Sequence, residues 1–193
     1  MESVLPNRSW TPELDRKACA LAWIVLDVDG VLTDGRLHLG NDGELVKSFH
    51  VRDGLAVKLA QAAGLQVAIL SARSSEIVAR RAAEIGIAEI VQGCEDKAAA
   101  LRELLARRGV ASAAAAYVGD DLQDLAALRA AGLSAAPADA VAEVRDAVDY
   151  VTDARGGDGC VRELIERVLV ARGAWSAAVE RFAGAGAPDG ERG

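Results

Sequence analysis

The sequence is poor in cysteine and in long apolar runs. Its three cysteines, Cys19, Cys94 and Cys160, are far apart and form no CxxC pair, so neither a zinc site nor a disulfide framework is indicated. We expect them to be buried thiols in a reducing compartment. No apolar run approaches the roughly 20 residues of a membrane span, and residues 1–22 do not resemble a signal peptide. These absences predict a cytoplasmic protein with no membrane partner.

The sequence also lacks a basic stretch and a nucleotide-binding loop. The formal net charge is −7, the isoelectric point is about 4.9, and no block of lysine or arginine occurs. Nucleic acid is therefore not an expected partner, although single basic residues could still hold a small anion. The pattern GxxxxGK[ST] is absent, which excludes a P-loop.

Alanine, leucine and valine make up most of the hydrophobic residues. Hydrophobic residues account for 51% of the 193 residues, whereas aromatic residues account for only 4%. A chain of this length and composition can form one domain with a sizeable core. The aliphatic composition favours helices and buried strands.

Short apolar runs alternate with amphipathic segments along the chain. The runs predict buried strands at residues 23–26, 65–70, 88–91, 114–118 and 149–151. The segments between them predict helices at residues 54–63, 76–85, 96–108, 122–131 and 138–148. This alternation is typical of an α/β fold with a doubly wound, Rossmann-like parallel sheet.

Residues 35–50 (GRLHLGNDGELVKSFH) break this pattern. They alternate with period two on both sides of Asn41-Asp42-Gly43, which predicts an inserted β-hairpin and no large cap domain. The hairpin could decorate a sheet edge, form a flap beside a site, or offer a surface to a partner subunit. Its apolar side is assigned to Leu37, Leu39, Leu45 and Phe49. That side must be covered, because an isolated hairpin is marginally stable.

The domain boundaries follow from these patterns. Residues 1–20 are expected to be an N-terminal extension, and residues 21–172 the folded domain. Residues 173–193 are expected to be a partly disordered tail, because their glycine, alanine, proline and charge cannot bury enough surface to fold alone.

Polar side chains follow four of the predicted strands. In open α/β sheets, ligands bind beyond the carboxyl ends of the strands. The stretch LDVDGVLTDG (26–35) provides the first group, and aspartates there are costly unless they are paired or bind a metal. The residues concerned are Asp27, Asp29, Ser71, Arg73, Lys97, Asp120, Asp121 and Asp124.

Each of these residues also has an ordinary interpretation. Asp27 and Asp29 could end a strand in a plain turn, and Ser71 or Asp120 could cap a helix. Arg73 and Lys97 could be solvent-exposed, although a lysine in the first turn of a helix is disfavoured by the helix dipole. If the sheet is parallel, all four groups share one edge, and their joint chemistry then favours a functional site over coincidence.

Such an edge could bind a metal and transfer a phosphoryl group. Two carboxylates from different strands can hold Mg²⁺, and a serine hydroxyl with a lysine can hold a phosphate. One aspartate could then accept the phosphoryl group as an acyl phosphate. A second carboxylate could protonate the leaving oxygen and later activate water.

The order of these motifs resembles the haloacid dehalogenase superfamily of phosphatases. DVDG (27–30), SAR (71–73), Lys97 and GDDLQD (119–124) are similar to its four motifs. The hairpin with GNDGE, FHVRDG (49–54) and GGDGCVREL (156–164) resemble one branch, the 3-deoxy-D-manno-octulosonate 8-phosphate (KDO 8-phosphate) phosphatases. The resemblance covers roughly residues 20 to 172.

This resemblance implies roles for particular residues. Asp27 would be the nucleophile, Asp29 the general acid and base, and Lys97 a catalytic residue that binds the phosphoryl group. Mg²⁺ would be held by Asp27, the backbone carbonyl of Asp29, and Asp120. Substrate binding would fall to Ser71, Ala72, Arg73, Arg81 and Arg52.

The sequence alone leaves several points open. Either Asp121 or Asp124 could support the metal site. Ala72 stands where the branch usually has glycine, which would matter if its φ angle is positive. The glycines Gly156, Gly157 and Gly159 could let the chain pass close to a site or form a plain loop.

The resemblance implies an Mg²⁺-dependent phosphoric monoester hydrolase of lipopolysaccharide biosynthesis. Its expected reaction converts KDO 8-phosphate to KDO and phosphate through an aspartyl-phosphate intermediate. A nonulosonate 9-phosphate or another sugar phosphate is an alternative substrate, and a non-catalytic oligomerisation module is an alternative function. The resemblance also implies a homotetramer in which the hairpins meet.

Overall fold

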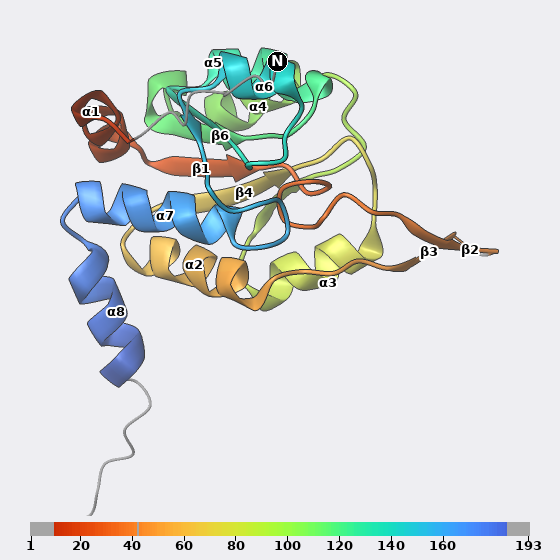
Figure 1. Ribbon diagram of the computed structural model, residues 1–193, viewed down its shortest axis with the longest axis horizontal. Coiled ribbons are helices and arrows are strands. Elements are labelled where there is room, and N and C mark those ends of the chain that lie inside the picture. Colours follow the sequence, from red (N-terminus) through yellow and green to blue (C-terminus); the bar gives the residue numbers. More distant parts are fainter. Residues whose placement is uncertain (1–9, 42, 185–193) are drawn as a thin grey trace, which may run out of the picture.

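A six-stranded, fully parallel sheet forms the centre of the molecule (Figure 1). The structure is a computed structural model and describes residues 10–41 and 43–184. In order across the sheet, the strands are β5 (Glu89–Val91), β4 (Gln66–Leu70), β1 (Trp23–Leu26), β6 (Ala115–Val118), β7 (Leu133–Ala136) and β8 (Tyr150–Val151). The predicted α/β fold with a doubly wound parallel sheet is confirmed.

The first strand occupies the middle of the sheet. All four residues of β1 are buried, and each pairs with both β4 and β6. The ladder with β6 continues past the end of the strand, because the N–H of Asp27 donates to the carbonyl of Val118 at 3.0 Å. Asp27 is therefore fixed at the centre of the carboxyl edge.

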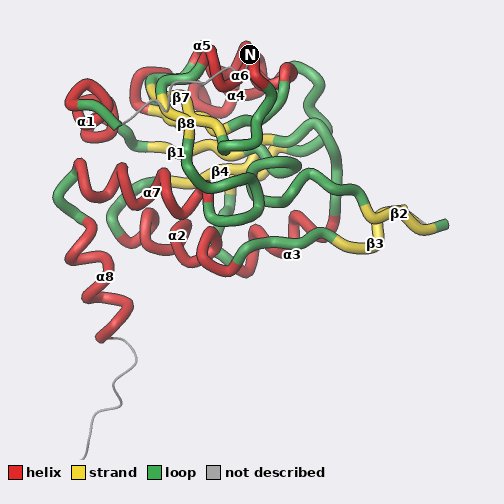
Figure 2. Tube along the Cα trace, viewed as in Figure 1, coloured by secondary structure: helices red, strands yellow, loops and turns green. Residues whose placement is uncertain are grey.

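Helices cover both faces of the sheet (Figure 2). On one face lie α2 (Val51–Ala62), α3 (Glu76–Glu84) and α7 (Cys160–Ala171). On the other lie α4 (Lys97–Arg107), α5 (Leu125–Ala130) and α6 (Ala142–Ala147). The 3-10 turns are η1 (Ser112–Ala114) and η2 (Leu122–Asp124). Within the described ranges, no helix combines the length and apolar character needed to cross a bilayer.

Two further helices lie outside residues 21–172, the predicted domain. Helix α1 (Pro12–Ala20) packs against α7 and contributes Leu14 and Ala18 to the core, and Thr11 caps its first turn. Helix α8 (Trp175–Gly184) follows α7 directly. Residues 185–193, which belong to the segment predicted to be partly disordered, lie outside the described part of the chain.

The structure corrects two expectations about elements and burial. Strand β7 was not predicted, because its sequence LSAA has no branched aliphatic run, yet all four of its residues are buried between β6 and β8. The three cysteines are free, as predicted, but only Cys160 is buried, because Cys94 is half-buried and Cys19 is exposed on α1.

The inserted hairpin projects from the body of the molecule (Figure 1). Strands β2 (His38–Gly40) and β3 (Gly43–Val46) pair antiparallel, as predicted. Leu39 and Leu45 are 62% and 63% exposed. Phe49 was wrongly assigned to this apolar side: it packs against the main core, and its ring lies 5.9 Å from the Arg81 guanidinium.

Candidate active site

Three carboxylates meet at the carboxyl edge of the sheet. Asp27 follows β1, and Asp120 and Asp124 follow β6. One oxygen from each lies within 4.8 Å of the others. Asp27 and Asp124 are buried, whereas Asp120 is half-buried. The predicted meeting of the first and fourth motifs is therefore observed.

Asp124 anchors this cluster. One of its oxygens accepts hydrogen bonds from Lys97 Nζ at 2.7 Å and from Tyr117 Oη at 2.8 Å. The other accepts from the backbone N–H groups of Asp120 and Asp121, each at 3.2 Å. By contrast, the Asp121 side chain is exposed and accepts from the N–H of Leu122. Of the two candidates left open by the sequence, Asp124 is the one whose side chain belongs to the carboxylate cluster.

Lys97 links two of the carboxylates. It is the first residue of α4, and its ammonium lies 2.8 Å from Asp27 Oδ2 and 2.7 Å from Asp124 Oδ1. Burial favours the neutral amine, but the two carboxylates outweigh it and raise the lysine pKa. The position that the helix dipole disfavours is thus stabilised by direct ion pairs. The alternative of a solvent-exposed Lys97 is wrong.

The cluster carries an excess of negative charge. Burial, reinforced by the Asp124 carboxylate, raises the pKa of Asp27 to about 6. Burial and the Asp27 and Asp124 carboxylates raise the pKa of Asp120 to about 7. One lysine faces three carboxylates in this cluster, so a bound cation would relieve their repulsion.

The oxygen donors fit a hard divalent cation. Asp120 Oδ1 is buried and has no hydrogen-bond partner among the described residues. A buried carboxylate oxygen without a partner is costly, and Mg²⁺ prefers oxygen ligands of this kind. Asp27 and Asp120 are the side chains available to hold it, whereas the oxygens of Asp124 are already occupied by four donors.

Glycine lets two loops approach this cluster. Gly30 has a φ angle of 90°, and a Cβ atom there would collide with the Asp120 carboxylate. A Cβ atom on Gly156 would collide with the backbone of Gly30. The N–H of Gly157 also donates to the carbonyl of Val31 at 2.9 Å. The glycine-rich loop before α7 therefore packs directly against the loop that carries Asp27 and Asp29.

The carboxylate of Asp29 is not part of the cluster and has its own partners. It forms an ion pair with Lys47, which follows β3, and its Oδ2 atom lies 3.7 Å from Arg73 Nε. Its predicted contribution to the metal site was through the backbone carbonyl, which leaves the side chain free for proton transfer. Asp27 and Asp29 thus pair with different lysines, Lys97 and Lys47, although only Val28 lies between them.

The second motif, residues 71–73, follows β4 and lies beside Asp29. Ser71 is buried, and its hydroxyl accepts a hydrogen bond from the N–H of Arg73 at 3.3 Å. Among the described residues, no residue other than glycine has a positive φ angle. Ala72 therefore takes the place of the usual glycine without backbone strain, which answers the question that the sequence left open.

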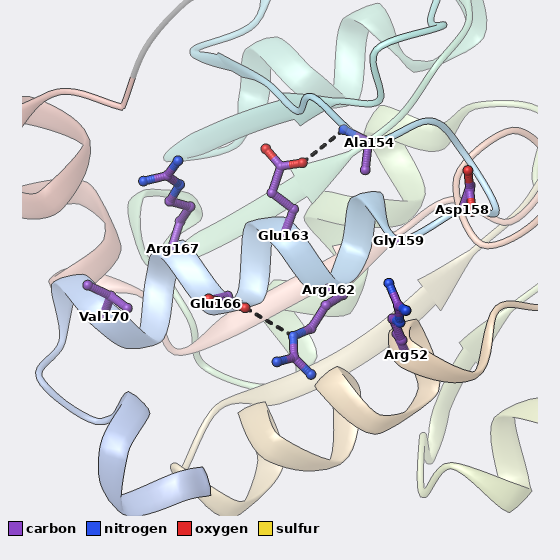
Figure 3. A pocket seen from close by; sticks show the side chains of 9 residues that line it. All are labelled: Arg52, Ala154, Asp158, Gly159, Arg162, Glu163, Glu166, Arg167 and Val170. Atoms are coloured by element: carbon purple, nitrogen blue, oxygen red, sulfur yellow. Dashed lines mark hydrogen bonds and ion pairs between the residues drawn. The ribbon is translucent and has the colours of Figure 1, made fainter.

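Two predicted substrate-binding arginines lie elsewhere in the chain. Arg81 on α3 pairs with Glu84 at 2.9 Å. Arg52, near the start of α2, lines a surface cavity of about 450 Å³ beside Arg162 and Arg167 of α7 (Figure 3). Within residues 10–41 and 43–184, neither Arg52 nor Arg81 forms a hydrogen bond or ion pair with the carboxylate cluster.

Sequence reasoning missed Lys47 and Tyr117. Tyr117 is the only residue of strand β6 with a side-chain hydroxyl, and it is fully buried. Lys47 has the same parity as Leu45 and Phe49 in the period-two pattern of the hairpin. A charge among apolar residues of one parity was the signal that could have identified it.

The buried sheet and the cluster of Asp27, Lys97, Asp120 and Asp124 define a class of protein. They are characteristic of haloacid dehalogenase-like hydrolases, and residues 76–164 match that family. Over 83% of its length, the chain is 45% identical to the KDO 8-phosphate phosphatase KdsC of Haemophilus influenzae, of which it covers 89%. It is 41% identical to the KdsC protein of Salmonella typhimurium, covering 84% of this chain and 87% of the relative. The chain belongs to the KDO 8-phosphate phosphatase family.

Solved structures agree with this assignment. The cobalt-bound phosphatase of Haemophilus influenzae superposes with a TM-score of 0.82 at 45% identity, over 83% of this chain and 94% of that one. The Moraxella catarrhalis enzyme, solved with magnesium, phosphate and KDO, superposes with a TM-score of 0.87 at 38% identity, over 90% and 99% of the two chains. The resemblance inferred from the motifs is confirmed.

Proposed function

We propose that this protein is a magnesium-dependent phosphatase that converts KDO 8-phosphate to KDO and phosphate. The observation that carries the proposal is the cluster of Asp27, Lys97 and Asp120 at the end of the central strand. Family membership and a relative solved with magnesium, phosphate and KDO support the choice of substrate and metal.

In the proposed reaction, Asp27 attacks the phosphorus atom and forms an aspartyl phosphate. The bond between phosphorus and the sugar oxygen breaks, and Asp29 gives that oxygen a proton. A water then attacks the same phosphorus atom, Asp29 takes its proton, and the bond to Asp27 breaks to release phosphate. A bound Mg²⁺ supplies charge neutralisation for the phosphoryl group.

The other residues have supporting roles in this proposal. Lys97 keeps Asp27 ionised and offers positive charge to the phosphoryl oxygens, and the Ser71 hydroxyl binds the same oxygens. Ala72 and Arg73 form the edge of the sugar site. Arg52 and Arg81 do not reach the cluster within one subunit, so any role in recognising the sugar acid requires a substrate that extends to them or a neighbouring subunit.

A substrate panel tests the function. We expect kcat/KM to be far higher for KDO 8-phosphate than for a nonulosonate 9-phosphate, glucose 6-phosphate or p-nitrophenyl phosphate. EDTA should abolish turnover, and Mg²⁺ should restore it. Equal kcat/KM across the panel would leave a generic phosphatase. Release of no phosphate from any substrate would favour the non-catalytic module.

The proposal includes a homotetramer built through the hairpins. Leu39 and Leu45 present an exposed apolar surface that one subunit does not cover. Contacts among four hairpins would bury it, and cyclic symmetry would close the assembly. We expect Leu39→Asp with Leu45→Asp to give smaller species in sedimentation, whereas Val170→Asp, which alters exposed Val170 on α7, should not. A wild-type monomer that is fully active at nanomolar concentration would contradict the tetramer.

The proposed setting is the cytoplasm, within lipopolysaccharide biosynthesis. The three free cysteines suit a reducing compartment. Cell fractionation followed by immunodetection tests the location. Recovery of the protein with the periplasmic or membrane fraction would contradict it.

A further inference from the structure

A chain of polar contacts connects the hairpin to Asp29. The Ser75 hydroxyl, at the start of α3, donates to Glu44 Oε2 at 2.5 Å. Glu44 Oε1 lies 3.0 Å from Lys47 Nζ, and Lys47 forms an ion pair with Asp29 Oδ1. The hairpin, whose strands are otherwise largely exposed, is thereby joined to the residue proposed to transfer protons.

The burial of Lys47 is unusual for a lysine on a projecting hairpin. Its side chain is only 1% exposed, whereas Leu39 and Leu45 on the same hairpin lie in solvent. Lysine is rarely buried, because removing an ammonium from water is costly unless carboxylates compensate for it. The two carboxylates that compensate here are Asp29 and Glu44. Burying Lys47 in this way requires both carboxylates at defined positions around one ammonium group. This indicates that Lys47 does more than keep the hairpin soluble.

The second cation near Asp29 is held less firmly. Arg73 Nε lies 3.7 Å from Asp29 Oδ2, and its side chain is 49% exposed. A half-exposed pair at that distance contributes little to the orientation of a carboxylate. Lys47 is therefore the main contact that fixes the direction of the Asp29 side chain.

We propose that Lys47 is a positioning residue of the active site. It holds the Asp29 carboxylate where that group exchanges a proton with the sugar oxygen of the substrate, and Glu44 and Ser75 hold Lys47 in turn. This inference rests on the proposed function. It assigns the hairpin a direct part in the chemistry of its own subunit, in addition to its proposed contacts with other subunits.

The choice of leaving group separates this role from a purely structural one. A sugar alkoxide is a poor leaving group and needs the proton from Asp29, whereas p-nitrophenolate leaves without one. Lys47→Met should therefore lower kcat for KDO 8-phosphate by at least ~10²-fold, the range typical of general acid catalysis. The pre-steady-state burst of p-nitrophenolate from p-nitrophenyl phosphate should slow far less, and KM should change little for either substrate.

Matched variants complete the experiment. Lys58→Met alters exposed Lys58 on α2 and should behave as wild type with both substrates. Lys47→Arg keeps a cation and should recover part of the lost rate. Asp29→Asn should show the same leaving-group selectivity. Combining it with Lys47→Met should add little further loss, because both changes remove one function.

Several outcomes would overturn the inference. Lys47→Met could retain the wild-type kcat for KDO 8-phosphate, or it could lose both reactions equally while remaining folded by circular dichroism. Additive losses with Asp29→Asn would also contradict it. If Lys47→Met does not fold, Glu44→Gln takes its place, and a wild-type leaving-group profile in that variant counts against the inference. Absence of activity in the wild type would reject the proposed function instead.

Discussion

Asp124 shows how much of this site is devoted to holding charges in place. It takes no direct part in the proposed chemistry, yet it accepts hydrogen bonds from Lys97, Tyr117 and two backbone N–H groups. These contacts fix the Asp120 loop and place the ammonium of Lys97 against Asp27. Charges that are already held in place do not have to reorganise during a reaction. This preorganisation is the usual source of electrostatic catalysis.

The first prediction concerns the nucleophile. Asp27→Asn should abolish turnover and leave the fold intact, because the amide keeps the shape of the side chain but does not attack phosphorus. Phosphate release and circular dichroism measure the two properties. Asp15→Asn, on the exposed surface of α1, is the control and should retain full activity. Full activity of Asp27→Asn would rule out the covalent intermediate.

The second prediction concerns the metal. Asp120→Ala removes a carboxylate whose Oδ1 atom is buried without a partner, and it should weaken Mg²⁺ binding. The loss of Mg²⁺ affinity should exceed roughly 10-fold, the lower end of the cost of removing a residue that only hydrogen-bonds to a metal ligand. Calorimetric titration with Mg²⁺ measures this, and Asp121→Ala, which alters the exposed neighbour, should bind Mg²⁺ almost as wild type does. Unchanged Mg²⁺ affinity of Asp120→Ala would remove it from the metal site.

At the residue scale, sequence reasoning found the groups at the strand ends but not all of their partners. Asp27, Ser71, Lys97 and Asp120 could be predicted because each lies within two residues of the end of a recognisable strand or begins the next helix. Lys47 could not, because its contact with Asp29 depends on how the hairpin folds back. The period of a hairpin tells which residues share a side, but not which of them reach the body of the protein.

At the scale of elements, one carboxylate joins two helices. Asp53 of α2 accepts hydrogen bonds from the N–H groups of Gly159 (3.2 Å) and Arg162 (2.7 Å) at the start of α7. Gly159 occupies the N-cap position of α7 and has no side chain to cap it. Asp53 therefore satisfies from another helix the donors that a cap residue normally satisfies. Burial raises the Asp53 pKa, although these two donors oppose the rise.

The third prediction follows from this contact. Asp53→Ala should lower the free energy of unfolding by about 1–3 kcal/mol, because it leaves two helix donors without a partner. Urea denaturation measures the change. Glu166→Gln breaks a partly exposed ion pair with Arg162 on the same helix and should cost at most about 1 kcal/mol. If the two variants lose the same free energy of unfolding, the contact between α2 and α7 stabilises the protein no more than a surface ion pair does.

Elements were predictable where their sequence has a clear period or a branched aliphatic run. Strands β1 and β4 satisfy this condition and agree with the structure within one residue, and the two hairpin strands lie inside the predicted range 35–50. Strand β7 does not, because Ala135 and Ala136 favour helix, and only its place between β6 and β8 makes it a strand. Helix α2 begins three residues before the predicted start, because the His50 side chain caps it.

At the scale of the whole molecule, stability should depend on pH and on metal. The folded pKa values of Asp27 and Asp120, about 6 and about 7, lie above the ordinary value of 3.8. Between these values the folded state binds more protons than the unfolded state, so raising the pH lowers stability. The stabilising contribution of these two groups is fully present below pH 3.8 and is lost as the pH rises through the folded pKa values, about 6 and about 7.

The fourth prediction is the corresponding melting experiment. In EDTA, the melting temperature should fall between pH 5 and pH 8, by about 2–4 °C for each kcal/mol lost. Mg²⁺ should raise it again at pH 8, because the ion binds only the folded state. Asp120→Asn should show a weaker pH dependence than wild type. A melting temperature that rises across this range in both proteins would show that these carboxylates do not govern it.

The central position of β1 has a consequence for synthesis on the ribosome. Its neighbours β4 and β6 lie about 40 and 90 residues further along the chain, and α7, which covers the same face as α2, comes later still. When the chain has emerged from the ribosome only up to β6, α7 is still missing. Helix α2 and the adjacent face of the sheet are then not covered by it. We therefore expect stable folding to wait until α7 has left the exit tunnel. Chains arrested before residue 160 should remain sensitive to protease, whereas chains with α7 fully emerged should resist it.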